Sequence, residues 1–199
     1  MTRLQSILAI ASATAGFASA AAAQTTAPET APATAATATT APSEPPCADP
    51  AFRQLDFWVG EWDLSWALPN GGRGEGRSVI TRDEYGDCVI YERFAGGGFT
   101  GMSVSTFHAG PGKWRQTWVD DQGGYYALVG GPASGEDHDF ELVDTRLSDD
   151  APRLRMIWQD VTADSLVWRW QRQAEEGGPW VDLWVIDYIR STADERAPD

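Results

Sequence analysis

Short connections rich in glycine are the feature of this sequence that most restricts its fold. Segments in which apolar and polar residues alternate are separated by turn-forming runs such as Gly110-Pro111-Gly112 and Glu175-Glu176-Gly177-Gly178. Parallel strands need crossover connections of roughly a dozen residues or more, so connections this short join antiparallel neighbours. About ten strands are expected, at 61–66, 75–82, 88–94, 99–108, 113–120, 125–129, 139–146, 153–161, 165–173 and 180–190.

This pattern predicts an all-β fold, an up-and-down antiparallel closed barrel of about ten strands. A two-sheet sandwich with the same number of strands is the alternative. Closure is favoured because so many consecutive strands without covering helices would otherwise leave unpaired edges. A short helix is expected before the first strand, at 50–59, where Phe52, Leu55 and Trp58 follow helical spacing.

The N-terminal part has the composition of an export signal followed by a linker. Residues 1–23 combine Arg3, an apolar stretch and small residues, which predicts a signal peptide cleaved near Ala23. Residues 24–46 are almost entirely Ala, Thr and Pro and are expected to be disordered. The folded domain is expected at 47–191 and a flexible tail at 192–199. We therefore expect a periplasmic or secreted protein without an integral membrane segment after processing.

Cysteine content and charge narrow the possible partners. The chain has two cysteines, Cys47 and Cys88, and in an exported protein we expect them to form a disulfide, with two free buried thiols as the alternative. The formal net charge is −14, and Lys113 is the only lysine. Binding to nucleic acid needs a basic stripe, so a nucleic-acid partner is not expected.

Three blocks of the sequence carry a family likeness. LDFWVGEWDLS at 55–65, GFTGMSVSTF followed by GKWRQTWVDDQGG within 98–124, and DLWVIDYIR at 182–190 resemble a family of secreted bacterial lipocalin-like proteins of unknown function. The resemblance implies a closed barrel with an internal cavity and carries no reaction with it. Gly60-Glu61-Trp62 is similar to the Gly-x-Trp of the first strand in calycins. That likeness implies that Arg190, at the end of the last strand, stacks on Trp62 where the barrel closes, a cation–π contact worth roughly 0.5 to 2 kcal/mol.

Ten tryptophans suggest where a ligand could bind. They fall into pairs such as Trp114 and Trp118, and residues an even number apart share one face of a strand. If these faces turn inward, they form an aromatic cavity suited to a small hydrophobic or aromatic molecule. The predicted ligand-binding residues are Arg93, Trp114, Gln116, Trp118, Trp158, Trp168, Trp170, Asp182, Trp184 and Tyr188.

Other interpretations stay open at this stage. The tryptophans could fill the barrel or cover its outside, and Gln116 and Asp182 could simply satisfy neighbouring indoles or arginines. Indoles on the outside would indicate an envelope-associated protein-interaction domain. A barrel isomerase or hydrolase could use Asp160, Asp182 or Arg93, although no nucleophile elbow or nucleotide-binding motif is present.

No cofactor or metal site is expected from the sequence. His108 and His138 are the two histidines, and they form no metal-binding spacing with each other or with the cysteines. Haem is the one cofactor to weigh, because the distantly related nitrobindins hold haem in such a barrel through a histidine. No motif carries that role to His138, which is expected to be solvent-exposed.

Overall fold

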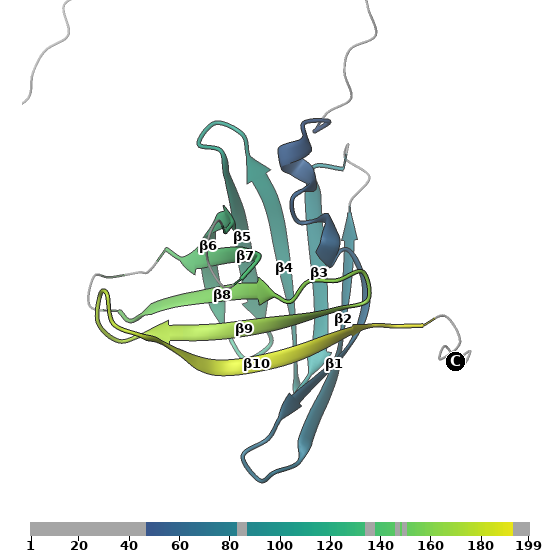
Figure 1. Cartoon of the computed structure of the whole chain (residues 1–199), viewed down its shortest axis with the longest axis vertical. Coiled ribbons are helices and arrows are strands. Elements are labelled where there is room, and N and C mark those ends of the chain that lie inside the picture. Colours follow the sequence, from purple (N-terminus) through teal and green to yellow (C-terminus); the bar gives the residue numbers. More distant parts are fainter. Residues whose placement is uncertain (1–46, 83–86, 134–137, 146–147, 149–150, 193–199) are drawn as a thin grey trace, which may run out of the picture. The chain divides into compact units, whose positions relative to one another are not determined.

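The structure of the protein is a computed structural model that describes residues 47–82, 87–133, 138–145, 148 and 151–192 (Figure 1). The expected signal peptide at 1–23, the linker at 24–46 and residues 193–199 of the expected tail lie outside the described residues. No helix in the described part of the chain combines the length and the apolar character needed to cross a membrane.

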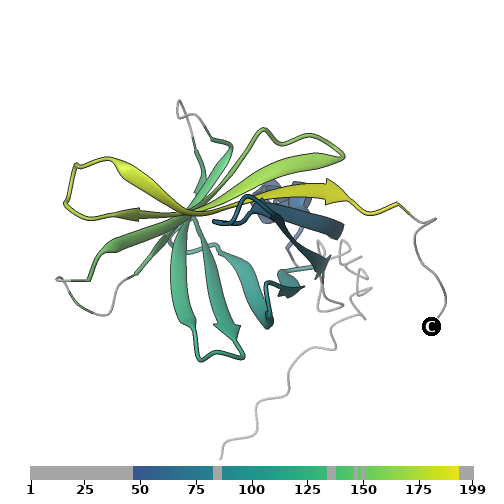
Figure 2. The ribbon, with the colours of Figure 1, turned by 90° about the horizontal axis from the view of Figure 1, so that it is seen from below.

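Ten antiparallel strands form a closed barrel, which confirms the predicted fold. The strands are β1 (Gly60–Ala67), β2 (Arg73–Arg82), β3 (Val89–Gly96), β4 (Phe99–His108), β5 (Lys113–Asp120), β6 (Tyr125–Pro132), β7 (Phe140–Asp144), β8 (Arg153–Gln159), β9 (Ser165–Gln173) and β10 (Trp180–Arg190). Each strand pairs with its neighbours in sequence, and β1 also pairs with β10. Figure 2 shows the last strand, in yellow, beside the first, in dark blue. This pairing excludes the sandwich alternative, because no edge of the sheet is left open.

The predicted helix is two short 3-10 helices. The first, η1 (Pro50–Arg53), begins where the Asp49 side chain accepts a hydrogen bond of 2.8 Å from the backbone N–H of Ala51. The second, η2 (Asp56–Trp58), ends at Val59, whose backbone is extended and leads directly into β1. The helical spacing of the apolar residues was therefore a correct indication of a helical segment, although the segment is interrupted at Gln54 and Leu55.

The segment that holds these helices closes one end of the barrel. Its side chains make edge contacts with the interior: Phe52 packs on Phe107 with ring centroids 5.3 Å apart, and Trp58 packs on Trp158 at 5.3 Å. A disulfide between Cys47 and Cys88 ties the start of the segment to the residue before β3, which confirms the predicted bond. Aromatic burial and one covalent link thus fix the segment across the barrel end.

The first and last strands meet at Trp62 and Arg190, which are direct partners in the pairing of β1 with β10. The Arg190 guanidinium carbon lies 4.2 Å from the centre of the Trp62 ring, and the Trp62 Nε1 donates to the carbonyl of Trp58 at 2.8 Å. Gly60 has a φ of +144°, and a side chain there would collide with the Arg190 guanidinium. Gly60 therefore leaves room for the Arg190 guanidinium, and Trp62 provides the ring on which the guanidinium lies.

Candidate functional site

The barrel interior is divided along its length into a packed core and a cavity. Near the closed end, Trp114 and Trp158 are fully buried and pack around Phe140, with ring centroids 6.2 and 5.6 Å from it. Further along the strands the side chains leave a cavity of about 200 Å³. Its lining residues are Trp58, Glu92, Phe94, Phe99, Trp118, Asp120, Tyr126, Met156, Trp168, Trp170, Trp184, Ile186 and Tyr188.

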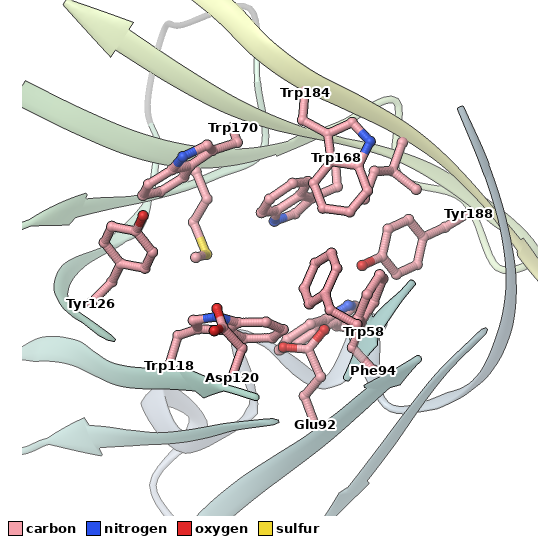
Figure 3. Close-up of a pocket in the computed structure, with 13 residues that line it drawn as sticks. Trp58, Glu92, Phe94, Trp118, Asp120, Tyr126, Trp168, Trp170, Trp184 and Tyr188 are labelled. Atoms are coloured by element: carbon pink, nitrogen blue, oxygen red, sulfur yellow. The ribbon is translucent and has the colours of Figure 1, made fainter. Parts of the chain in front are cut away.

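Aromatic rings form most of the cavity wall (Figure 3). On β9, Trp168 and Trp170 lie parallel, with an interplanar angle of 4°. Trp184 on β10 stands at 89° to Trp168 and also contacts Phe94 with ring centroids 5.9 Å apart. Trp118 on β5 packs on Phe94 from the other side, at 6.1 Å. The rings therefore pack on one another around the cavity and leave it open.

A buried carboxyl group interrupts this aromatic wall. Glu92 on β3 is only 5% exposed. Its two carboxyl oxygens accept hydrogen bonds from Ser78 Oγ at 3.1 Å and from Ser103 Oγ at 2.8 Å. Burial raises the pKa of Glu92 from an ordinary 4.5 to about 7, although the two serine hydroxyls act in the opposite direction. The group is therefore divided between its protonated and ionised forms at neutral pH.

A second carboxyl group, Asp120 at the end of β5, lies in a different environment. Its oxygens accept hydrogen bonds from Trp118 Nε1 at 3.0 Å and from the backbone N–H groups of Gly124 at 2.7 Å and Gln122 at 3.0 Å. These donors lower the pKa of Asp120. The cavity therefore has a fixed negative charge at Asp120 and a titratable one at Glu92.

Two phenol groups complete the polar part of the lining. Tyr126 on β6 packs on Trp170, with ring centroids 5.0 Å apart. Tyr188 on β10 is buried, and its burial and the nearby charge of Glu92 raise the pKa of its hydroxyl well above the usual value. The Tyr188 hydroxyl therefore stays protonated and can donate a hydrogen bond within the cavity, into which Figure 3 shows it pointing.

Half of the predicted ligand-binding residues line this cavity. They are Trp118, Trp168, Trp170, Trp184 and Tyr188. Three others, Trp114, Gln116 and Trp158, face the interior but belong to the packed core near the closed end. There Trp114 Nε1 donates to Gln54 Oε1 at 3.1 Å, and Gln116 Nε2 donates to Ser105 Oγ at 2.9 Å. For these residues, the sequence predicted that the side chains face the barrel interior. It did not predict how far along the barrel axis each side chain lies.

Arg93 and Asp182, the last two predicted ligand-binding residues, lie outside the barrel. Arg93 is exposed on the outer face of β3, because Ile90, Glu92 and Phe94 occupy its inner face. Asp182 is also exposed, and it accepts hydrogen bonds from Arg169 at 2.6 Å and from Gln171 at 2.8 Å. Both residues are therefore removed from the candidate site.

A β-bulge explains the position of Asp182. The pairing of β10 with β9 shifts between Asp182 and Trp184, so the even spacing of Trp180, Asp182 and Trp184 does not place them on one face. Trp184 points into the cavity, whereas Trp180 lies outside, with the Arg155 guanidinium carbon 4.2 Å from its ring centre. Nine of the ten tryptophans belong to the barrel core or pack against it, which overturns the interpretation with the indoles on the outside.

The sequence reasoning missed both acidic groups of the site. Glu92 lies between Ile90 and Phe94 in an alternating pattern, and Asp120 follows Trp118 by two residues. An acidic residue flanked at both even positions by apolar residues was the available signal for Glu92. It was passed over in favour of Arg93, which lies on the opposite face of the same strand.

The residues considered for metal, haem and catalytic roles lie elsewhere. His108 is exposed, whereas His138, which was expected to be exposed, is buried with 7% exposure and lines a second cavity with Arg153, Arg155 and Trp180. Asp160 is exposed in the turn after β8, with a φ of +53°. Among the described residues, no group of three or more His, Cys, Asp or Glu side chains is arranged to hold a metal ion.

Comparison with known proteins gives no further assignment. No protein-family model matches the chain, and no curated protein matches it. The function proposed for the chain therefore depends on the geometry of the cavity.

Proposed function

We propose that this chain is an exported barrel that binds a small hydrophobic or aromatic molecule in its internal cavity. The observation that carries the proposal is the cavity of about 200 Å³ walled by Trp118, Trp168, Trp170 and Trp184. Sites that bind small molecules are concave, mainly apolar and equipped with a few fixed polar groups. The carboxyl groups of Glu92 and Asp120 are such groups.

The size of the cavity limits the ligand. An apolar cavity of roughly 150 Å³ holds one benzene molecule, so about 200 Å³ accommodates a single ring with a short side chain. The flat faces of Trp168 and Trp184 meet at nearly a right angle, so one can stack on a planar ligand while the other contacts its edge. A compact aromatic compound therefore fits better than a long acyl chain.

Export and family membership are part of the same proposal. A disulfide fits a periplasmic or extracellular protein, and the sequence predicts a signal peptide at 1–23. The ten-stranded closed barrel is compatible with the lipocalin-like family that the sequence resembles. In such a protein the barrel is the scaffold, and the function lies in the residues that line its cavity.

Ligand binding can be tested by calorimetric titration with 2-phenylethanol, a neutral compound of one ring and a two-carbon side chain. We expect saturable binding that Trp118→Ala and Trp168→Ala weaken at least about tenfold, which corresponds to 1.4 kcal/mol. Trp180→Ala is the matched control, because Trp180 lies outside the barrel against Arg155 and should leave the affinity unchanged. Equal losses in all three variants would refute the proposal, and so would the absence of saturable binding by any single-ring compound of this size.

A second candidate function, contact with a protein partner, is favoured by exposed apolar residues on the outside of the barrel. Met102 on β4 pairs with Val119 on β5, and Val119 pairs with Tyr125 on β6. All three side chains are exposed, by 38%, 40% and 57%. Exposed apolar residues that adjoin one another can mark an interaction surface. Cross-linking in the periplasm should then lose its products in Val119→Asp and keep them in Trp118→Ala.

A further inference from the structure

The charged side chains that line the aromatic cavity are both acidic. Of its lining residues, Glu92 and Asp120 are acidic, Tyr126 and Tyr188 are phenols, and the described lining contains no Lys, Arg or His. Arg172 follows Trp170 by two residues on β9, but it is exposed and does not line the cavity. The cavity is therefore an acidic site among aromatic rings.

Glu92 has hydrogen-bond donors but, among the residues that the structure describes, no cation beside it. In the described part of the chain, Ser78 on β2 and Ser103 on β4 donate to its carboxyl group, and the charge of Glu92 in turn raises the pKa of the nearby Tyr188 on β10. Taking a carboxylate out of water is costly unless an opposite charge compensates for it. A glutamine could fill the same position and bond to the same two serines without this cost. A carboxyl group at this position is therefore explained by a compensating positive charge that comes from outside the protein.

Aromatic rings of the cavity lining provide a second kind of attraction for a cation. Positive groups are attracted to the faces of indole and phenyl rings, most strongly to tryptophan and more so away from water. Figure 3 shows Glu92, Asp120 and Trp118 on one wall of the cavity, with Trp168 and Trp184 on the opposite wall. The topology agrees, because β3 and β5 lie across the barrel from β9 and β10. A ring held between these walls would place an attached ammonium group within the acidic wall.

We infer that the cavity selects small organic cations, each consisting of one aromatic ring and a short side chain that ends in a protonated amine. This inference rests on the proposed function, since it names the ligand class of the same cavity. The aromatic part of the ligand packs on Trp168 and Trp184, and its ammonium group pairs with Glu92 and Asp120. The net charge of −14 favours the approach of a cation from solution.

Three probes of equal size and different charge test this inference. They are 2-phenylethylamine, 2-phenylethanol and phenylacetate, titrated calorimetrically at pH 8. We expect the amine to bind about tenfold or more tightly than the alcohol, as a desolvated charge pair and cation–π contact provide, and phenylacetate to bind most weakly. Equal affinity for the amine and the alcohol would overturn the inference and leave the proposed function standing. Absence of binding by all three would overturn both.

Substitutions assign the selectivity to the carboxyl groups. Glu92→Gln should reduce the affinity for 2-phenylethylamine to about that for 2-phenylethanol. Asp120→Asn should weaken binding of the amine as well. Asp63→Asn is the matched control, because it removes one negative charge from an exposed position on the outer face of β1. An equal loss in Asp63→Asn would show that net charge alone causes the preference and would overturn the inference.

The pH dependence of binding distinguishes a charge pair from a merely structural role of Glu92. Alkyl amines stay protonated between pH 6 and 8, and Asp120 has a lowered pKa. Because the pKa of Glu92 is about 7 and the uncharged site keeps the weaker affinity expected for Glu92→Gln, the affinity for the amine should be about fivefold lower at pH 6 than at pH 8. Glu92→Gln should abolish this difference, and binding of 2-phenylethanol should not show it. A pH effect that persists in Glu92→Gln would refute the pairing.

Discussion

Replacing Glu92 by glutamine should stabilise the protein, and by more at high pH than at low pH. The folded protein holds the proton on Glu92 with a pKa of about 7, against an ordinary 4.5. Because the folded state binds this proton more tightly than the unfolded chain, stability is greatest with Glu92 protonated and falls as the pH rises towards 7. The two pKa values correspond to about 3 kcal/mol of free energy once both states are ionised.

Urea denaturation of both proteins, followed by tryptophan fluorescence with the disulfide intact, measures this effect. Glu92→Gln keeps the side-chain length and can bond to Ser78 and Ser103, so packing contributes equally at every pH. Between pH 5 and pH 8 we expect the advantage of the variant in unfolding free energy to grow by about 2 to 3 kcal/mol. Asp63→Asn, an exposed substitution, should stay within about 0.5 kcal/mol of the wild type. An advantage of Glu92→Gln that is constant with pH, or shrinks as the pH rises, would refute the reasoning.

Three further predictions concern barrel closure, the disulfide and the cavity wall. Trp62→Ala should lower the unfolding free energy by about 3 to 5 kcal/mol in urea denaturation, since Trp62 is fully buried against Arg190; a loss below about 1 kcal/mol would contradict its role in closure. Reducing the disulfide should lower stability by about 3 to 4 kcal/mol through the unfolded state, and unchanged denaturation midpoints would contradict this. Gly101→Ala places a methyl group against the Trp118 ring and should weaken binding of 2-phenylethanol about tenfold in calorimetry. Gly131→Ala, which meets no atom within 4 Å, is its control, and equal effects would refute the mechanism.

Strand positions could be predicted because both the strands and their boundaries leave signals in the sequence. The segments at 99–108, 113–120, 165–173 and 180–190 were predicted with the bounds that β4, β5, β9 and β10 have. Turn-forming residues mark most of these ends, and alternation marks the strands between them. The strands predicted at 139–146 and 153–161 are shorter in the structure, where β7 is Phe140–Asp144 and β8 stops at Gln159, before Asp160 with its positive φ.

The depth of a residue in the barrel could not be predicted from alternation. Trp114 and Trp118 share the inner face of β5, yet Trp114 is sealed under the helical segment and Trp118 lines the cavity. Depth depends on which end of the barrel this segment covers, and the contacts that decide this join residues as distant as Gln54 and Trp114. Alternation describes one strand at a time and contains no such information.

The two misplaced polar residues fail for different physical reasons. For Asp182, a bulge interrupts the alternation of inward and outward side chains along β10. Because β10 has apolar residues on both faces, the sequence does not show where this interruption occurs. For Arg93 the alternation held, but the wrong face was chosen. Burial of Ile90 and Phe94 outweighs the cost of burying Glu92, which lies between them on the same face.

The carboxyl group of Glu92 is what separates a cavity that selects cations from a cavity that is merely lined with indoles. Indoles packed for stability need no acid among them, and this acid destabilises the fold at neutral pH by the mechanism given above. One substitution therefore tests both interpretations, because Glu92→Gln should increase the unfolding free energy and decrease the affinity for 2-phenylethylamine. A gain in stability without a loss of amine binding would leave the buried charge without a functional explanation. Opposite changes would show that stability is given up for recognition at this position.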